Sequence, residues 1–134
     1  MTTLLILAAI LFFAWDLFWR AARVEPISPR RLQKMLEDPR DARILVDVRT
    51  SHEYELFHIK GTENRPDLLL NPDALKAEDR DRQIVVICMS GHRSAVVAYR
   101  LKKQGFGHVS YLAWGMMAWM LGGGPTIRGK GRNR

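Results

Sequence analysis

Cysteine is nearly absent from this chain, because Cys88 is its only cysteine. A single cysteine excludes an internal disulfide framework and a zinc site made of several cysteines. A lone thiol is compatible with a reducing compartment, where free cysteines persist. The 134 residues leave room for one domain, and no internal repeat divides them.

Basic residues are absent before Arg20, and this part of the chain is almost entirely apolar. A helix needs about 20 apolar residues to cross the hydrocarbon core, with about 17 as the lower limit, so residues 1–19 are just long enough. Asp16 is the one charge in this segment and lies close enough to its end to reach the interface beside Arg20. Trp15 and Trp19 suit an interfacial aromatic belt. We therefore expect residues 1–23 to form a transmembrane anchor.

The same apolar segment has two alternative interpretations. A cleaved signal peptide carries lysine or arginine before its apolar core, and none is present here. An interfacial or core helix would show a polar face, which this segment lacks. Under the positive-inside rule the arginines that follow predict a single-pass membrane protein whose domain faces the cytoplasm; they are Arg20, Arg23, Arg30 and Arg31.

Acidic residues are outnumbered, since 14 Asp and Glu stand against 21 Lys and Arg, for a net charge of +7 and a pI of about 10.1. No basic run alternates with aromatic residues as on a nucleic-acid surface, so we expect no nucleic acid partner. An anionic membrane lipid surface and an anionic substrate account for the charge. Residues 126–134 are basic and contain glycine, which predicts a flexible tail.

Short β-branched runs alternate with helical patterns between residues 24 and 125. The runs at 44–48, 84–88 and 109–112 predict buried strands. Apolar spacing and capping residues predict helices at 29–38, 51–57, 94–104 and 116–121. This alternation is typical of an α/β domain with a mainly parallel sheet and helices on both faces.

The run that ends at Cys88 passes through a short polar loop directly into a helix. Open α/β sheets hold ligands at such strand ends, where loop amides and the helix N-terminus favour anions. A thiol beside these groups and Arg93 should ionise readily, and the thiolate is the reactive form. An inert buried cysteine is the alternative, which the Gly91-His92-Arg93-Ser94 continuation disfavours.

Three segments in order resemble the single-domain rhodaneses, which are sulfurtransferases with a Cys-X-X-Gly-X-Arg-Ser loop. The resemblance covers residues 24–125, taken as the domain, and rests on residues 88–94, on 45–49 with 53–54 and 58–61, and on 111–115 with 118–119. It departs from the family pattern at Phe57, at Arg65-Pro66 and at Trp114, which occupies the first position of a Gly-Gly pair. Related phosphatases and arsenate reductases carry a loop one residue longer than the six residues from Cys88 to Arg93, so the resemblance ranks those activities lower.

The resemblance implies that Cys88 takes the outer sulfur of a small anionic donor such as thiosulfate, as a persulfide, and passes it to a thiol or cyanide. Arg93 would orient the donor, and the implied substrate-binding loop is Met89, Ser90, Gly91, His92 and Arg93. Asp47, Arg49 and Ser94 are expected to support it, with Asp47 and Arg49 as an ion pair or a loop cap that holds the strand ends. No metal or organic cofactor is expected. The alternative is a non-enzymatic binding or sulfur-carrier module for a membrane partner, with a protein as the sulfur acceptor.

Overall fold

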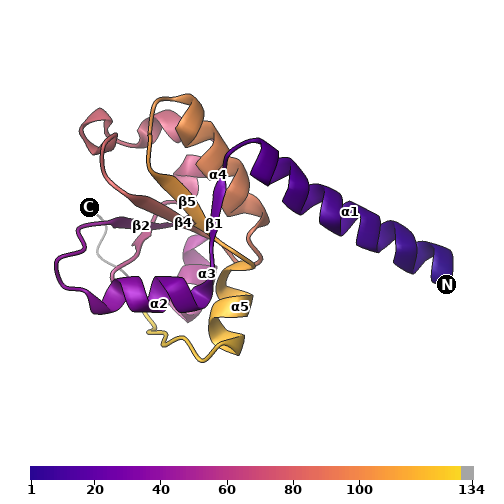
Figure 1. Cartoon of the computed structure of the whole chain (residues 1–134). Helices are drawn as coiled ribbons and strands as arrows, with labels where there is room; N and C mark the ends of the chain where they lie inside the picture. Colours follow the sequence, from indigo (N-terminus) through magenta and orange to yellow (C-terminus); the bar gives the residue numbers. More distant parts are fainter. Residues whose placement is uncertain (131–134) are drawn as a thin grey trace.

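The structure is a computed structural model that describes residues 1–130 (Figure 1). Within these residues one five-stranded parallel sheet has the order β1-β5-β4-β2-β3. Its strands are β1 (Glu25–Ile27), β2 (Ile44–Asp47), β3 (Glu63–Asn64), β4 (Ile84–Ile87) and β5 (Val109–Leu112). Strand β4 lies in the middle, so Cys88 at its carboxyl end is flanked by the ends of β2 and β5.

Helices connect the strands as the alternating pattern predicts. They are α1 (Thr2–Ala21), α2 (Pro29–Glu37), α3 (Ser51–Leu56), α4 (His92–Lys103) and α5 (Gly115–Leu121), with short 3-10 helices η1 (Pro66–Leu69), η2 (Pro72–Ala74) and η3 (Ala77–Asp79). Helix α4 begins two residues earlier than expected, because Gly91 adopts a left-handed conformation and turns the chain at once into the helix.

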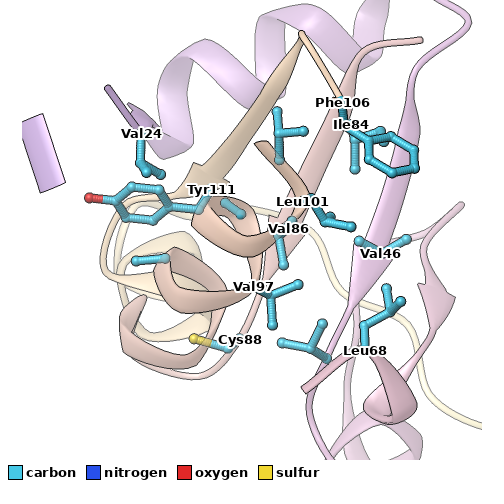
Figure 2. Close-up of a cluster of buried hydrophobic side chains, with 14 of the residues drawn as sticks. Val24, Val46, Leu68, Ile84, Val86, Cys88, Val97, Leu101, Phe106 and Tyr111 are labelled. Carbon is cyan, nitrogen blue, oxygen red and sulfur yellow. The ribbon is translucent and has the colours of Figure 1, made fainter. Parts of the chain in front are cut away.

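The sheet has an apolar core on each face, which confirms the predicted α/β architecture. Side chains alternate along β4, so Ile84, Val86 and Cys88 face α4 while Val85 and Ile87 face α2 and α5. Figure 2 shows Ile84 and Phe106 at one end of the α4-side core and Cys88 at the other. The candidate nucleophile thus lies at the edge of a packed core.

Helix α1 extends away from the domain towards the N-terminus (Figure 1), but its last turns pack against the domain. Trp19 is buried in the α4-side core and lies edge-on to Tyr99, with ring centroids 5.8 Å apart. The expectation that Trp19 belongs to an interfacial belt is therefore wrong, because the ring fills a gap in the domain core. Asp16 and Arg20, near the end of the apolar segment, form an ion pair at 3.1 Å.

Residues 127–129, which the sequence assigns to the flexible tail, are held against the domain by backbone hydrogen bonds. The backbone of Ile127 exchanges two hydrogen bonds with His58, each at 2.9 Å, and Gly129 donates to the carbonyl of Glu55. These contacts attach residues 127–129 to the end of α3 and the loop after it. Residues 131–134 of the expected tail lie outside the described residues.

Candidate active site

The sulfur of Cys88 lies inside the turn that joins β4 to α4. The backbone N–H of Gly91 donates to Sγ at 3.0 Å, and the thiol donates to the hydroxyl of Ser94 at 3.3 Å. Cys88, Gly91 and Ser94 are all buried. A hydroxyl both donates and accepts, so Ser94 can accept from the thiol and donate to the thiolate once the proton leaves.

Helix α5 fixes the direction of the peptide groups that follow Cys88. The N–H of Met116 donates to the carbonyl of Cys88 at 2.9 Å, and the N–H of Met117 donates to the carbonyl of Met89 at 3.0 Å. In a trans peptide the N–H points opposite to the carbonyl. The backbone N–H groups of Met89 and Ser90 therefore point away from α5 and cannot donate hydrogen bonds to that helix.

Two glycines permit this close approach of α5 and the loop. Gly115 has φ +58, and a Cβ there would lie 2.3 Å from the carbonyl oxygen of Cys88. Gly91 has φ +88, and a Cβ there would lie 2.9 Å from the backbone nitrogen of Trp114. Neither position accepts a side chain without displacing the backbone that surrounds the sulfur.

Trp114, between these segments, also adopts a left-handed conformation, with φ +59. Such a backbone is common for glycine and strained for a bulky residue. Trp114, which replaces the first glycine of the family's pair, therefore has a backbone conformation that glycine favours, and its indole is exposed.

Arg93 is directed to a carboxylate of helix α3. Its two terminal nitrogens bond the two carboxylate oxygens of Glu53, at 3.0 and 3.1 Å. The hydrogen bonds from Arg93, assisted by those from Thr50, lower the pKa of Glu53 to about 2. The proposed donor-binding role of Arg93 stays a prediction, and in this structure a partner already occupies its guanidinium.

Asp47 and Arg49 form the expected ion pair, and both are fully buried. The Arg49 guanidinium bonds both carboxylate oxygens of Asp47 at 2.8–3.1 Å. It also donates to the carbonyls of Glu53 and Phe57, at 3.3 and 2.7 Å. Arg49 therefore ties the end of β2 to the middle and the end of the α3 segment, and through Glu53 it positions Arg93.

Ser90 and His92 bond each other on the outer side of the loop, with Oγ and Nδ1 2.9 Å apart. His92 is exposed and lies against Trp15 of α1, with ring centroids at 4.9 Å. The structure thus brings Gly91 and Ser94 to the sulfur, holds Met89 through its backbone, and places the side chains of Ser90 and His92 outside.

Glu53 is the site residue that sequence reasoning missed. Thr50 and Glu53 form a complete capping box, which the Thr-X-X-Glu spacing indicates. Its pairing with Arg93, forty positions away, has no local signal in the sequence. Within residues 1–130, no group of three or more His, Cys, Asp or Glu side chains is arranged to hold a metal ion.

Comparison with known proteins agrees with this geometry. Residues 28–121 match the family model of the rhodanese-like domain. The chain is 33% identical to a sulfurtransferase of Allochromatium vinosum, over 81% of this chain and 99% of that protein. It is 36% identical to the probable adenylyltransferase/sulfurtransferase MoeZ of Mycobacterium tuberculosis, over 75% of this chain but only 26% of that protein.

A crystal structure of the Alr3790 protein from Anabaena sp. superposes with a TM-score of 0.66, at 30% identity, over 76% of this chain and 81% of that one. The parallel sheet, the cysteine loop after the central strand and the family match lead to one assignment. This chain belongs to the rhodanese-like domain family, which includes sulfurtransferases.

Proposed function

We propose that this protein is a membrane-anchored sulfurtransferase that carries sulfane sulfur on Cys88. The observation that carries the proposal is the sulfur held between a backbone N–H and the Ser94 hydroxyl, directly before a helix N-terminus. Such a site stabilises a negative charge on sulfur, which both the thiolate and the persulfide need.

The reaction has two displacement steps. The Cys88 thiolate attacks the outer sulfur of a donor such as thiosulfate, a new S–S bond forms, and sulfite leaves with the electrons of the broken bond. A thiol or cyanide then attacks the terminal sulfur of the Cys88 persulfide, and the thiolate is regenerated. Ping-pong kinetics follow from this covalent intermediate.

An anionic donor needs a cation in its binding site, and Arg93 is the cation at the Cys88 loop. Its release from Glu53 would turn two guanidinium donors towards an anionic substrate. Because Cys88 is fully buried, donor entry also requires the loop residues around the sulfur to move.

The anchor in this proposal is α1. By length and composition, Thr2–Ala21 is the helix in the described chain that is long and apolar enough to cross a membrane. The arginines after it support an orientation with the domain in the cytoplasm. Lipid is then a partner of the protein, beside the sulfur donor and acceptor.

Mass spectrometry of the full chain after exposure to thiosulfate tests the chemistry. We expect one added sulfur on the Cys88 peptide and release of thiocyanate when cyanide follows, with both lost in Cys88→Ser. Turnover by Cys88→Ser equal to that of the unaltered chain would refute the catalytic role. Flotation with phosphatidylcholine vesicles tests the anchor separately.

The second candidate is a sulfur-carrier module, in which a protein partner would open the loop over the buried Cys88 and load and unload its sulfur. A carrier would hold a persulfide on Cys88 after purification from cells yet release no thiocyanate from thiosulfate and cyanide. A pure binding module would show neither signal.

A further inference from the structure

Aromatic side chains of helix α1 contact the edge of the sheet that carries the Cys88 loop. Phe12 stacks on Trp114 with ring centroids 4.8 Å apart and planes 10° apart. Trp15 lies against His92, and Trp19 enters the core. The second half of α1 therefore runs along the domain beside the loop.

These contacts restrict how α1 enters a bilayer. Phe12 and Arg20 are separated by eight residues, or about 12 Å along a helix. If α1 stood along the membrane normal with Arg20 at the headgroups, Trp114 would lie about 12 Å below them. The Ser90–His92 pair would be drawn down with it, at the cost of dehydrating polar groups.

The outer face of α5 is apolar and uncovered in the described chain. Trp114, Met117, Met120 and Leu121 are 42–88% exposed. This face meets α1 through the Phe12–Trp114 stack, so the two helices form one apolar surface. We call the four α5-segment residues and Phe12 the apolar edge.

Charge and side-chain chemistry at this edge fit a bilayer. Arg20 and Arg23 are exposed at the end of α1, where they can meet lipid phosphates. Tryptophan prefers the headgroup level, because its ring is apolar and its N–H is polar. An apolar helix face with adjacent cations is typical of segments that lie 5–10 Å into the interfacial layer.

We propose that the apolar edge docks on the bilayer, so that α1 enters the membrane at an angle and the Cys88 loop is held at the headgroup layer. This rests on the proposed membrane anchor and adds a lipid-binding surface on the catalytic domain. One side of α5 donates hydrogen bonds to the loop from the amides of Met116 and Met117, while its other side contacts lipid. The protein would then exchange sulfur with partners at the membrane surface.

A fluorescent probe at Met117 tests the docking. In the full chain with Cys88→Ser, the variant Met117→Cys is labelled with an environment-sensitive nitrobenzoxadiazole group and reconstituted into vesicles of phosphatidylcholine and phosphatidylglycerol. The control is Glu78→Cys, because Glu78 is exposed and lies in η3, close before β4 and thus at the opposite edge of the sheet. Circular dichroism verifies that both labelled chains are folded.

We expect the Met117 probe to shift to the blue and to be quenched by lipids that carry a nitroxide near the headgroup, with no such change at Glu78. Vesicle flotation with both probes reporting water would overturn the docking and leave the anchor intact. Loss of flotation would overturn both. A blue shift that appears only at high protein-to-lipid ratio would assign the edge to a second copy and contradict the proposal.

Discussion

Arg93 and Glu53, forty residues apart, form a two-pronged ion pair at the edge of the candidate active site. The same Glu53 caps helix α3 through Thr50, and its backbone carbonyl is held by the buried Arg49. A chain of contacts thus runs from the Asp47–Arg49 pair through α3 to the cation of the loop. The position of Arg93 depends on a helix that lies far from it in the sequence.

The Glu53–Arg93 pair should give a defined acid dependence to folding. The pKa of Glu53 falls from 4.5 to about 2 on folding, chiefly through the hydrogen bonds from Arg93. A lowered carboxyl pKa stabilises the folded state above the unfolded pKa, and this stabilisation is lost as pH falls through the folded one. We expect Glu53→Gln to cost about 0.5–1 kcal/mol at neutral pH, since both side chains are partly exposed, and the difference to close between pH 4.5 and 2.

Urea unfolding of both chains across this pH range measures the effect. Glutamine preserves the capping box, so the substitution removes mainly the charge. Glu55→Gln on the same helix is the control for the loss of one negative charge from this helix. A difference in unfolding free energy between Glu53→Gln and the unaltered chain that persists at pH 2 would contradict the role given to the Glu53–Arg93 pair.

Asp47→Asn should destabilise the protein by about 3–5 kcal/mol, because it leaves the fully buried Arg49 without its counter-charge. The control is Asp67→Asn, which removes a carboxylate that also pairs with an arginine two residues away but at the surface, and should cost less than about 1 kcal/mol. Chemical denaturation compares the two. Equal losses would show that the burial of the Asp47–Arg49 pair does not matter.

Gly115→Ala should disturb the loop far more than the same substitution at a left-handed glycine elsewhere. Its Cβ would meet the carbonyl of Cys88 at 2.3 Å, whereas a Cβ at Gly123, with φ +75, would meet nothing within 4 Å. We expect Gly123→Ala to cost about 1 kcal/mol for its backbone conformation. Gly115→Ala should cost about 3 kcal/mol through the added overlap, and should lower persulfide formation in the fraction that folds. Stability curves and persulfide mass provide the two readouts.

Ser94→Ala should slow sulfur loading on Cys88 by about tenfold, which corresponds to one hydrogen bond of about 1.4 kcal/mol. The reason is that the thiolate and persulfide lose the hydroxyl 3.3 Å from Sγ. The rate of sulfite release from thiosulfate measures this step. Ser110→Ala, on strand β5, should leave the rate unchanged, and an equal loss in the two variants would refute a direct role of Ser94.

Several features of the site are predictable from local sequence. The apolar run before Cys88 predicts a buried strand, and Asp47 with Arg49 predicts an ion pair; both are observed. The first residue of α4 and the burial of Trp19 are not predictable from local sequence. Trp19 belongs by composition to the apolar segment, but the cavity that receives it is formed by residues distant in sequence.

By itself, the sequence determined the order of strands and helices, the one reactive thiol and the apolar segment before the domain, since these follow from hydrophobic period, turn residues and composition. Only the tertiary structure decided that Glu53 holds Arg93, that α5 orients the peptides after Cys88, and that Phe12 stacks on Trp114. Each of these contacts joins segments separated by at least 28 residues. Such contacts depend on how the sheet and its helices pack, which no local pattern of residues encodes.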